Sequence, residues 1–287
     1  MIERKNKIKD SKQLVITKSI VLVIFILYAI TLIFPFIWMI YNSFKTNPEF
    51  FSDIWALPED LTNGFVNLKY ALSLEINNST ILTMTLRSIF LTIVGTLVGL
   101  ASTSCVSYVV AKYKFPGKNL IYAVAISIML IPTIGSTSAT YKLINDLGLY
   151  DNYLALILMY SGGFGFQFLL MHGVFKSISW QYAEAAMMDG ASDFKVFTKV
   201  MLPMSMGTMV PLGILNAINI WNDYFTPYLY LKGKPTLAVG LQSMVSQMEY
   251  NANWPALFTL MIISMIPIII VFVSFQNKLW LMLLQEV

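Results

Sequence analysis

Apolar residues dominate six long stretches of the chain, which polar segments separate. These stretches cover approximately residues 19–44, 84–111, 119–143, 153–175, 203–229 and 256–281. A helix needs about 20 mostly apolar residues to cross the roughly 30 Å hydrocarbon core of a bilayer. Membrane β-barrels instead show alternating segments of about 10 residues, a pattern that this sequence lacks. The pattern predicts an all-α integral membrane protein with six transmembrane helices, in which residues 19–287 form a single transmembrane domain.

Composition agrees with a chain that lipid surrounds. Apolar residues make up 57% of the sequence and charged residues only 12%, whereas soluble domains carry about 25% charged residues. The first 18 residues are rich in lysine and arginine and precede the first apolar stretch without a small-residue cleavage site, so we expect this stretch to stay as a membrane span. The net charge of +4 comes from lysines beside the spans and requires no nucleic acid partner.

The distribution of positive charge predicts the orientation. If the N-terminus is cytoplasmic and six spans alternate, thirteen of the nineteen lysines and arginines lie on the inner side. Cytoplasmic loops carry an excess of these residues in membrane proteins. We therefore expect residues 1–18 to be a cytoplasmic segment, both termini to be cytoplasmic, and the chain to lie in a bacterial cell membrane.

The loop between the fourth and fifth spans, residues 177–202, is too polar to cross a bilayer and has helical periodicity. Ser179 can cap a short helix, and Gly190 can end it in the left-handed conformation. Ser192 can cap a second helix. The spacing predicts that Trp180, Ala183 and Met187 share one face of the first helix and that Phe194, Phe197 and Met201 share one face of the second. Pro203 is expected in the first turn of the fifth span. By physical chemistry alone, this segment is either an amphipathic elbow at the membrane surface or a docking element.

The residues of this loop resemble a known motif. Glu184, Ala185 and Ala186 are followed by Asp189 and Gly190, and then by Val200, Leu202 and Pro203 at fixed spacing. This arrangement is similar to the EAA loop of bacterial ATP-binding-cassette importer permeases, with valine where isoleucine is commoner. The resemblance implies that the loop is a coupling-helix hairpin seated in a cleft of a cytoplasmic ATPase.

Further segments resemble the carbohydrate-uptake branch of these permeases, typified by the second membrane subunit of the maltose system. They include Phe115-Pro116-Gly117-Lys118, Trp221-Asn222-Asp223-Tyr224 and Thr236-Leu237-Ala238-Val239-Gly240. The resemblance implies a heterodimer with a second permease, two ATPase subunits, an extracellular solute-binding protein and a sugar-like substrate. A polyol, glycerol phosphate or another hydroxylated solute remains an alternative.

Polar residues in the fifth span mark a candidate solute pathway. Asn216, Asn219, Asn222 and Asp223 fall on about one third of the helix circumference, and Tyr224 follows them. Amide and carboxylate groups can bind sugar hydroxyls, and an aromatic ring can cover an apolar sugar face. Alternatively, this stripe hydrogen-bonds neighbouring helices.

Catalytic chemistry is not legible in the sequence, and we expect no catalytic residue, metal site or cofactor in this chain. Cys105 and His172 are the only cysteine and histidine, and no phosphate-binding Gly-x-x-x-x-Gly-Lys-Ser/Thr loop is present. ATP and Mg²⁺ would therefore be bound by a separate ATPase chain. An ion-coupled secondary transporter is the main rival, and it usually requires titratable groups at the bilayer midplane. A membrane-embedded enzyme is the third possibility.

Overall fold

The computed structural model describes residues 12–131, 135–247 and 252–285. Most of the expected N-terminal segment, residues 1–11, lies outside these ranges. The chain divides into two compact units. The described residues up to Tyr70, together with Asn253–Ile262, form the first unit, and the described residues from Ala71 to Ala252 and from Ile263 onward form the second.

The first unit contains α1 (Lys12–Asn42), α2 (Asn47–Ser52) and the greater part of α3 (Asn63–Ser73). A capping box starts α2, because the Thr46 side chain accepts from the Glu49 N–H and the Glu49 carboxylate accepts from the Thr46 N–H. Lys45 is fully buried and donates from Nζ to the Asp53 carbonyl at 2.9 Å. The Asn67 amide donates to the carbonyls of Ser43 and Lys45, so these bonds fasten the chain that follows α1.

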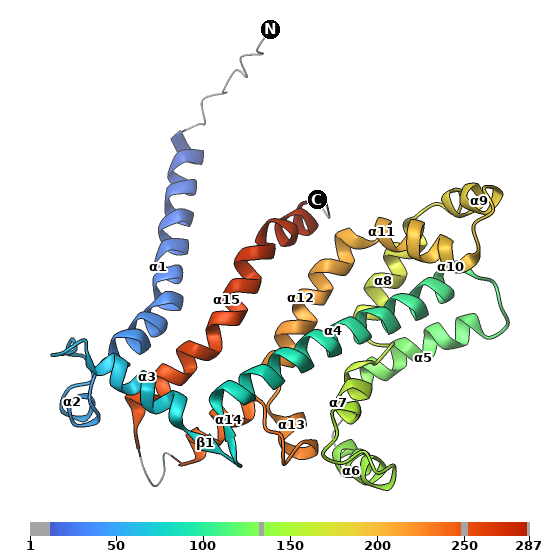
Figure 1. Cartoon of the computed structure of the whole chain (residues 1–287). Helices are drawn as coiled ribbons and strands as arrows, with labels where there is room; N and C mark the ends of the chain where they lie inside the picture. Colours follow the sequence, from blue (N-terminus) through green and yellow to red (C-terminus); the bar gives the residue numbers. More distant parts are fainter. Residues whose placement is uncertain (1–11, 132–134, 248–251, 286–287) are drawn as a thin grey trace. The chain divides into compact units, whose positions relative to one another are not determined.

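The second unit is built around α4 (Ile81–Lys112), which a small antiparallel hairpin of β1 (Glu75–Ile76) and β2 (Ser79–Thr80) precedes. Thr80 caps this helix through its hydroxyl, and 32 residues give a length of about 48 Å. Around α4 lie α5 (Lys118–Leu130), α6 (Ser136–Asp146), α7 (Tyr153–Tyr160), α8 (Phe166–Ser177) and α12 (Met206–Asn222) (Figure 1). The helix therefore connects the two ends of this unit.

Short elements occupy the two ends of the second unit. Next to the end of α4 lie α9 (Gln181–Met188), α10 (Asp193–Val196), a π-helical turn (Phe197–Met201) and α11 (Leu202–Met204). Near its beginning lie the hairpin, α6, α13 (Phe225–Tyr230) and α14 (Leu237–Gln247) (Figure 1). The last helix, α15 (Trp254–Gln285), begins in the first unit and continues into the second.

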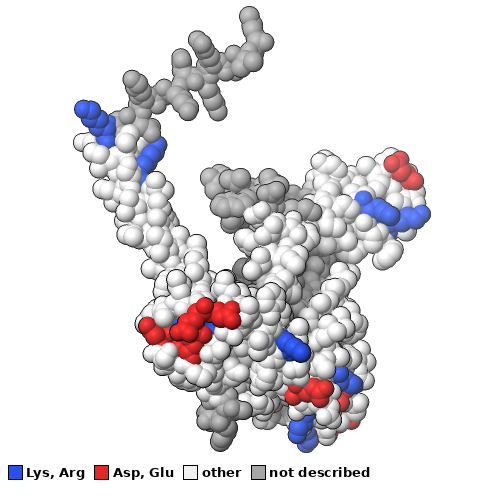
Figure 2. Space-filling view, turned by 60° about the vertical axis from the view of Figure 1, so that its left-hand side comes forward, with Lys and Arg blue, Asp and Glu red and all other residues white. Residues whose placement is uncertain are grey.

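Among the described residues, three helices are long and apolar enough to cross a membrane: α1, α4 and the Trp254–Gln276 part of α15. A fourth span results if Asp193–Met204 and Met206–Asn222, which meet at 80°, are counted as one. In Figure 2 the surface along the helices is largely uncharged, and the lysine, arginine and acidic side chains gather at the helix ends. A lipid environment around the helices and water at their ends explain this distribution.

Three of the expected spans are each divided into two helices. Residues 119–143 form α5 and α6, and a left-handed Gly135 with φ of 87° precedes α6. Residues 153–175 form α7 and α8, which the glycine-rich segment 161–165 separates. Residues 203–229 contain α12 and α13. The total of six spans therefore stays a prediction.

Candidate functional site

The segment from Gln181 to Val196 forms a short helix, a tight turn and a second short helix. Gly190 has φ of 81°, a conformation that L side chains rarely adopt. Its N–H donates to the Met187 carbonyl at 3.0 Å, and the Ala191 N–H donates to the Ala186 carbonyl at 3.0 Å. These two bonds form a Schellman motif, so Gly190 ends α9 in the way that the sequence predicts.

Beyond the turn, the backbone departs from a regular second helix. After α10 the chain makes a π-helical turn and then α11, and Ser205 separates α11 from α12 at the 80° bend. Pro203 lies at the start of α11, before the bend that leads into α12, and its place in the first turn of a fifth span stays a prediction. Because proline has no N–H to donate, regular i to i−4 bonding cannot run through this position. We call residues 181–204 the elbow.

An apolar core joins the elbow to three long helices of the second unit. Ala183, Val196 and Met201 of the elbow are fully buried. They belong to one cluster with the buried side chains Tyr108 of α4, Met171 and Phe175 of α8, and Leu212 of α12. The Phe197 ring lies 4.9 Å from that of Tyr108, measured between centroids. The elbow is therefore packed as part of this unit.

Polar contacts also tie the elbow to the end of α4. The Tyr113 hydroxyl donates to Asp193 Oδ1 at 2.9 Å, and the Lys112 ammonium donates to the Ile178 carbonyl just before the elbow. Burial, together with its hydrogen bonds, raises the pKa of Tyr113, which keeps its hydroxyl protonated as a donor. The Tyr113 ring also packs edge-on against Trp180, with 5.9 Å between centroids.

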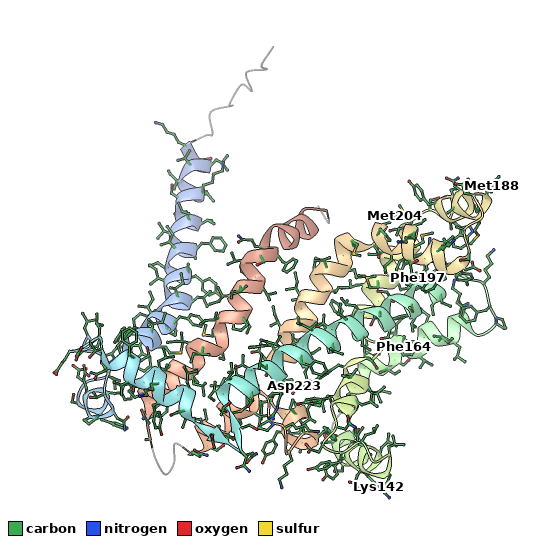
Figure 3. All side chains as sticks on the ribbon, viewed as in Figure 1. Lys142, Phe164, Met188, Phe197, Met204 and Asp223 are labelled. Carbon is green, nitrogen blue, oxygen red and sulfur yellow. The ribbon has the colours of Figure 1, made fainter. Side chains whose placement is uncertain are left out.

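The outer face of the elbow is partly apolar, which the sequence interpretation missed. Met188, which Figure 3 labels on α9, is 89% exposed, Phe194 is 74% exposed and Tyr182 is 53% exposed. The prediction that Phe194 shares a face with Phe197 and Met201 was wrong, because Phe194 is exposed whereas Phe197 and Met201 pack in the apolar core. Because the π-helical turn covers residues 197–201, the angular spacing from Phe194 to Met201 departs from that of a regular helix.

The eight motif residues are divided between the two faces of the elbow. Exposed members of the motif are Glu184, Ala185, Asp189, Gly190 and Pro203, and half-buried members are Ala186, Val200 and Leu202. The exposed group offers two carboxylates and a small side chain beside Met188. Such a surface can receive another protein closely, while the half-buried group holds the elbow in place.

The break between α7 and α8 lies against α4, and hydroxyl groups of α4 satisfy its carbonyls. Ser102 donates to the Ser161 carbonyl, and Thr103 Oγ1 donates to the Gly162 carbonyl at 3.3 Å. Further along α4, Ser107 Oγ donates to the carbonyl of Phe168 in the first turn of α8 at 3.2 Å. Non-helical backbone is tolerated inside a membrane only where such partners satisfy it.

Small residues on α4 allow this close approach. Gly95, Gly99, Thr103 and Ser107 repeat every four residues and are all buried. A Cβ atom on Gly99 would lie 2.8 Å from the Tyr160 carbonyl oxygen, which is closer than real Cβ contacts. Small residues at this spacing are typical of packed membrane helices.

In the predicted polar stripe of α12, some side chains make hydrogen bonds and others do not. The Asp223 carboxylate accepts from the Tyr160 hydroxyl at 2.9 Å and from the Thr226 N–H at 3.0 Å, so it connects α7, α12 and α13. The Asn222 amide donates to the Ile218 carbonyl at 3.0 Å. In the described part of the chain, the side-chain amides of Asn216 and Asn219 make no hydrogen bond.

The side chains of the stripe also differ in exposure. Asn219, Asn222 and Tyr224 are exposed, whereas Asn216 and Asp223 are half-buried. Asn216 faces α4, because its Nδ2 atom would lie 3.1 Å from a Cβ on Gly99. Hydrogen bonding to neighbouring elements is therefore observed for Asp223, and the pathway role of the stripe stays a prediction.

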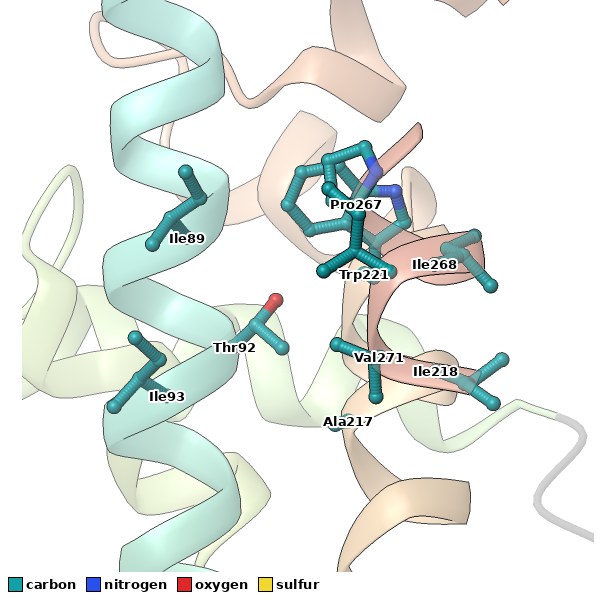
Figure 4. Close-up of a pocket in the computed structure, with 10 residues that line it drawn as sticks. Ile89, Thr92, Ile93, Ala217, Ile218, Trp221, Pro267, Ile268 and Val271 are labelled. Atoms are coloured by element: carbon teal, nitrogen blue, oxygen red, sulfur yellow. The ribbon is translucent and has the colours of Figure 1, made fainter. Parts of the chain in front are cut away.

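An apolar cavity of about 360 Å³ lies between α4, α12 and α15 in the second unit (Figure 4). Ile93, Ala217, Trp221 and Pro267 are among its lining residues, and Thr92 contributes a buried hydroxyl without a hydrogen-bond partner. A sugar needs several polar partners to replace its lost water. This cavity therefore does not suit a hydroxylated solute.

Comparison with known proteins identifies the family. Residues 95–279 match the model described as "Binding-protein-dependent transport system inner membrane component". The probable ABC transporter permease protein YurM of Bacillus subtilis is 30% identical over 94% of this chain and 88% of its own length. The diacetylchitobiose uptake system permease protein NgcG of Streptomyces coelicolor is 27% identical, over 88% of this chain and 83% of its own.

The fold is also that of a solved transporter chain. A chain of a bacterial ABC transporter involved in the import of the acidic polysaccharide alginate superimposes with a TM-score of 0.80 at 23% identity. The match covers 94% of this chain and 99% of the other. With the family match extending over most of the chain, this protein belongs to the inner membrane components of binding-protein-dependent transport systems.

Proposed function

We propose that this chain is one of two permease subunits of an ATP-binding-cassette importer for a sugar or oligosaccharide. A second permease, two cytoplasmic ATPase subunits and an extracellular solute-binding protein would complete the assembly. The named substrates of similar transporters, diacetylchitobiose and alginate, are both saccharides. They support a saccharide as the class of solute, in preference to a polyol or glycerol phosphate.

The exposed face of the elbow is the observation that carries this proposal. Met188 and Phe194 stand out into solvent, and Glu184 and Asp189 beside them are also exposed. A soluble surface rarely exposes large apolar side chains together with charge unless another protein covers them. We infer that an ATPase subunit covers this face and that the elbow is the coupling-helix hairpin.

The connections of the elbow explain how movement would reach the membrane. Its core includes residues of α4, α8 and α12, and Tyr113 fixes Asp193 to the end of α4. Because packed cores do not deform continuously, displacement of the elbow by the ATPases would move these helices as one body. Since α4 is about 48 Å long, it would carry the movement to the opposite end of the unit.

The proposed topology has six spans with both termini in the cytoplasm. The divided pairs α5–α6, α7–α8 and α12–α13 would each count as one span, and the hydroxyls of α4 support the α7–α8 break inside a membrane. The elbow then lies on the same side as the lysine-rich segment 1–18. Residues 19–287 would form one transmembrane permease domain.

For the solute pathway we propose Asn216 and Asn219 as the hydrogen-bonding groups, with Tyr224 as an exposed aromatic surface. The amides of Asn216 and Asn219 are free among the described residues, so they can bind a solute without breaking an existing bond. Asn222 and Asp223 would line the same pathway, while the Asp223 carboxylate also connects α7, α12 and α13.

Co-purification of the assembled transporter tests the function. Met188→Asp places a charge on the exposed face of the elbow without disturbing packing, because Met188 is 89% exposed. We expect it to reduce both the recovery of the ATPase and the ATP hydrolysis that the solute-loaded binding protein stimulates. Glu184→Ala should weaken the same two properties.

Leu147→Asp is the matched control, since Leu147 is also exposed and lies after α6, at the other end of the second unit. It should leave ATPase recovery unchanged. If Met188→Asp shows the same ATPase recovery and the same stimulated ATP hydrolysis as the wild type, the elbow is not the coupling element.

A further inference from the structure

A second cavity, of about 450 Å³, lies at the end of the second unit that is remote from the elbow. Its size is within the range of about 300–1,000 Å³ that small-ligand sites occupy. Its lining includes polar side chains from five separate segments: Asn77, Tyr141, Tyr150, Tyr228, Lys232 and Ser243. In contrast to the apolar cavity beside Trp221, this one therefore offers many hydrogen-bonding groups.

The β1–β2 hairpin fixes the position of Asn77. Asn77 and Asn78 have φ of 50° and 56°, and they form the two-residue turn between Ile76 and Ser79. Positive φ at both positions is typical of a type I′ turn, which asparagine tolerates. Arg87 of α4 donates to Ser79 Oγ at 2.8 Å, so the hairpin is held against the helix.

Asp151 fixes the segment that carries Tyr228 and Lys232. Its N–H donates to the Tyr230 carbonyl at 2.9 Å, and its Oδ1 atom accepts from the Gly233 N–H at 3.0 Å. Its carbonyl accepts from Lys234 Nζ at 2.6 Å. These three bonds connect the loop before α7 to the loop after α13, so the cavity walls are braced across the fold.

The aromatic groups present both ring surface and hydroxyls. The Tyr141 and Tyr150 rings meet edge-on with centroids 5.7 Å apart, and the Tyr141 and Tyr230 centroids are 6.0 Å apart. Tyr141 is 41% exposed and Tyr228 is 59% exposed, so each leaves ring area available. A pyranose ring has an apolar face that packs on an aromatic ring and hydroxyls that require donors and acceptors.

Charge narrows the class of ligand. Among the described residues that line the cavity, Lys232 is the only one with a charged side chain. Its ammonium group would repel a cationic group bound beside it, whereas it would not repel a neutral or acidic saccharide.

Because aromatic rings and hydrogen-bonding side chains line the same cavity, we propose that it is a saccharide-binding subsite. Tyr141 and Tyr228 would pack on a sugar ring, and Asn77, Ser243 and Lys232 would bind its polar groups. The inference deepens the proposed importer function and rests on it for the direction of transport. In the proposed topology the cavity faces the exterior, where it would receive a saccharide on the side of the binding protein. It would then act before the solute reaches α12.

Saturation-transfer NMR on the assembled transporter in nanodiscs, without the binding protein, tests this subsite. The probes are maltotriose, N,N′-diacetylchitobiose, arabinotriose and digalacturonate. We expect at least one probe to receive saturation from the transporter. Tyr141→Ala and Tyr228→Ala should each weaken its apparent affinity roughly two- to tenfold. Tyr141→Phe, which keeps the ring, should retain most of it.

Lys142→Ala is the matched control, because Lys142 follows Tyr141 on α6 but does not line the cavity. It should bind the probe as the wild type does. If no probe receives saturation, or if both tyrosine-to-alanine variants behave like Lys142→Ala, the subsite is wrong.

ATP hydrolysis by the same preparation separates the two proposals. If a saccharide-loaded binding protein stimulates ATP hydrolysis normally but no probe binds at the cavity, the subsite proposal is wrong and the importer proposal stands. If a probe binds in a way that depends on Tyr141 and Tyr228 but no saccharide stimulates ATP hydrolysis, the subsite proposal stands and the importer proposal is wrong.

Discussion

Gly99 provides a quantitative test of the packing between α4 and α7. In Gly99→Ala the new Cβ atom would lie 2.8 Å from the Tyr160 carbonyl oxygen and 3.1 Å from Asn216 Nδ2. The asparagine amide can move, but the carbonyl belongs to the backbone at the end of α7. The methyl group therefore requires that the two helices separate.

The expected magnitude follows from two opposing effects. Overpacking costs about 1–3 kcal/mol, whereas alanine in place of glycine within a helix stabilises by about 0.5–1 kcal/mol. Gly173→Ala in α8 is the matched comparison, because no atom lies within 4 Å of its new Cβ. The helix propensity gain is shared by both variants, so the difference between them should equal the overpacking cost of about 1–3 kcal/mol.

Unfolding of the purified chain in mixed micelles, followed by tryptophan fluorescence during titration with SDS, measures this difference. We expect Gly173→Ala to be at least as stable as the wild type and Gly99→Ala to be less stable. Equal stability of the two variants would show that α4 and α7 do not approach as closely as described.

Three other changes test separate parts of the structure. Thr103→Val leaves the Gly162 carbonyl without its donor and should cost about 0.6 kcal/mol, up to about 1.7, in the same titration; wild-type stability would contradict this bond. Tyr113 has a pKa raised above its ordinary value of 10.0, so its contribution to stability should decline as the pH rises above that value. Tyr113→Phe should remove this alkaline dependence, and an unchanged pH profile would exclude the proposed role of its hydroxyl. Arg87→Ala should accelerate hydrogen exchange in residues 231–240, because Arg87 donates to Ser79 and, at 3.5 Å, to the Pro235 carbonyl; unchanged exchange there would contradict this bracing role.

Long apolar runs were informative about helices that are continuous. The stretch 84–111 predicted α4 to within a few residues, because its length and composition alone require a helix in lipid. The broken pair α7–α8 could not be predicted in this way. Its non-helical carbonyls at Ser161 and Gly162 are acceptable because Ser102 and Thr103 of another helix lie opposite them. Which hydroxyl groups lie opposite these carbonyls depends on how the helices pack, and the apolar runs of the sequence do not give that packing.

In the elbow, too, features set by local sequence could be predicted, whereas features set by the wider fold could not. Gly190 is predictable, because a left-handed residue that ends a helix has a strong local preference. The outward position of Phe194 is not, because it depends on the π-helical turn that follows α10. The bracing role of Arg87 was likewise hidden, since Pro235 lies 148 residues away in the sequence.

Site-specific photocrosslinking from Met188 tests the central claim, that the elbow docks on an ATPase. A benzophenone amino acid would replace Met188 in the assembled transporter, with Tyr228 as the control position at the other end of the second unit. We expect a crosslinked product that contains the ATPase from position 188 and none from position 228. An intact, co-purifying complex that gives no ATPase crosslink from position 188 would contradict it.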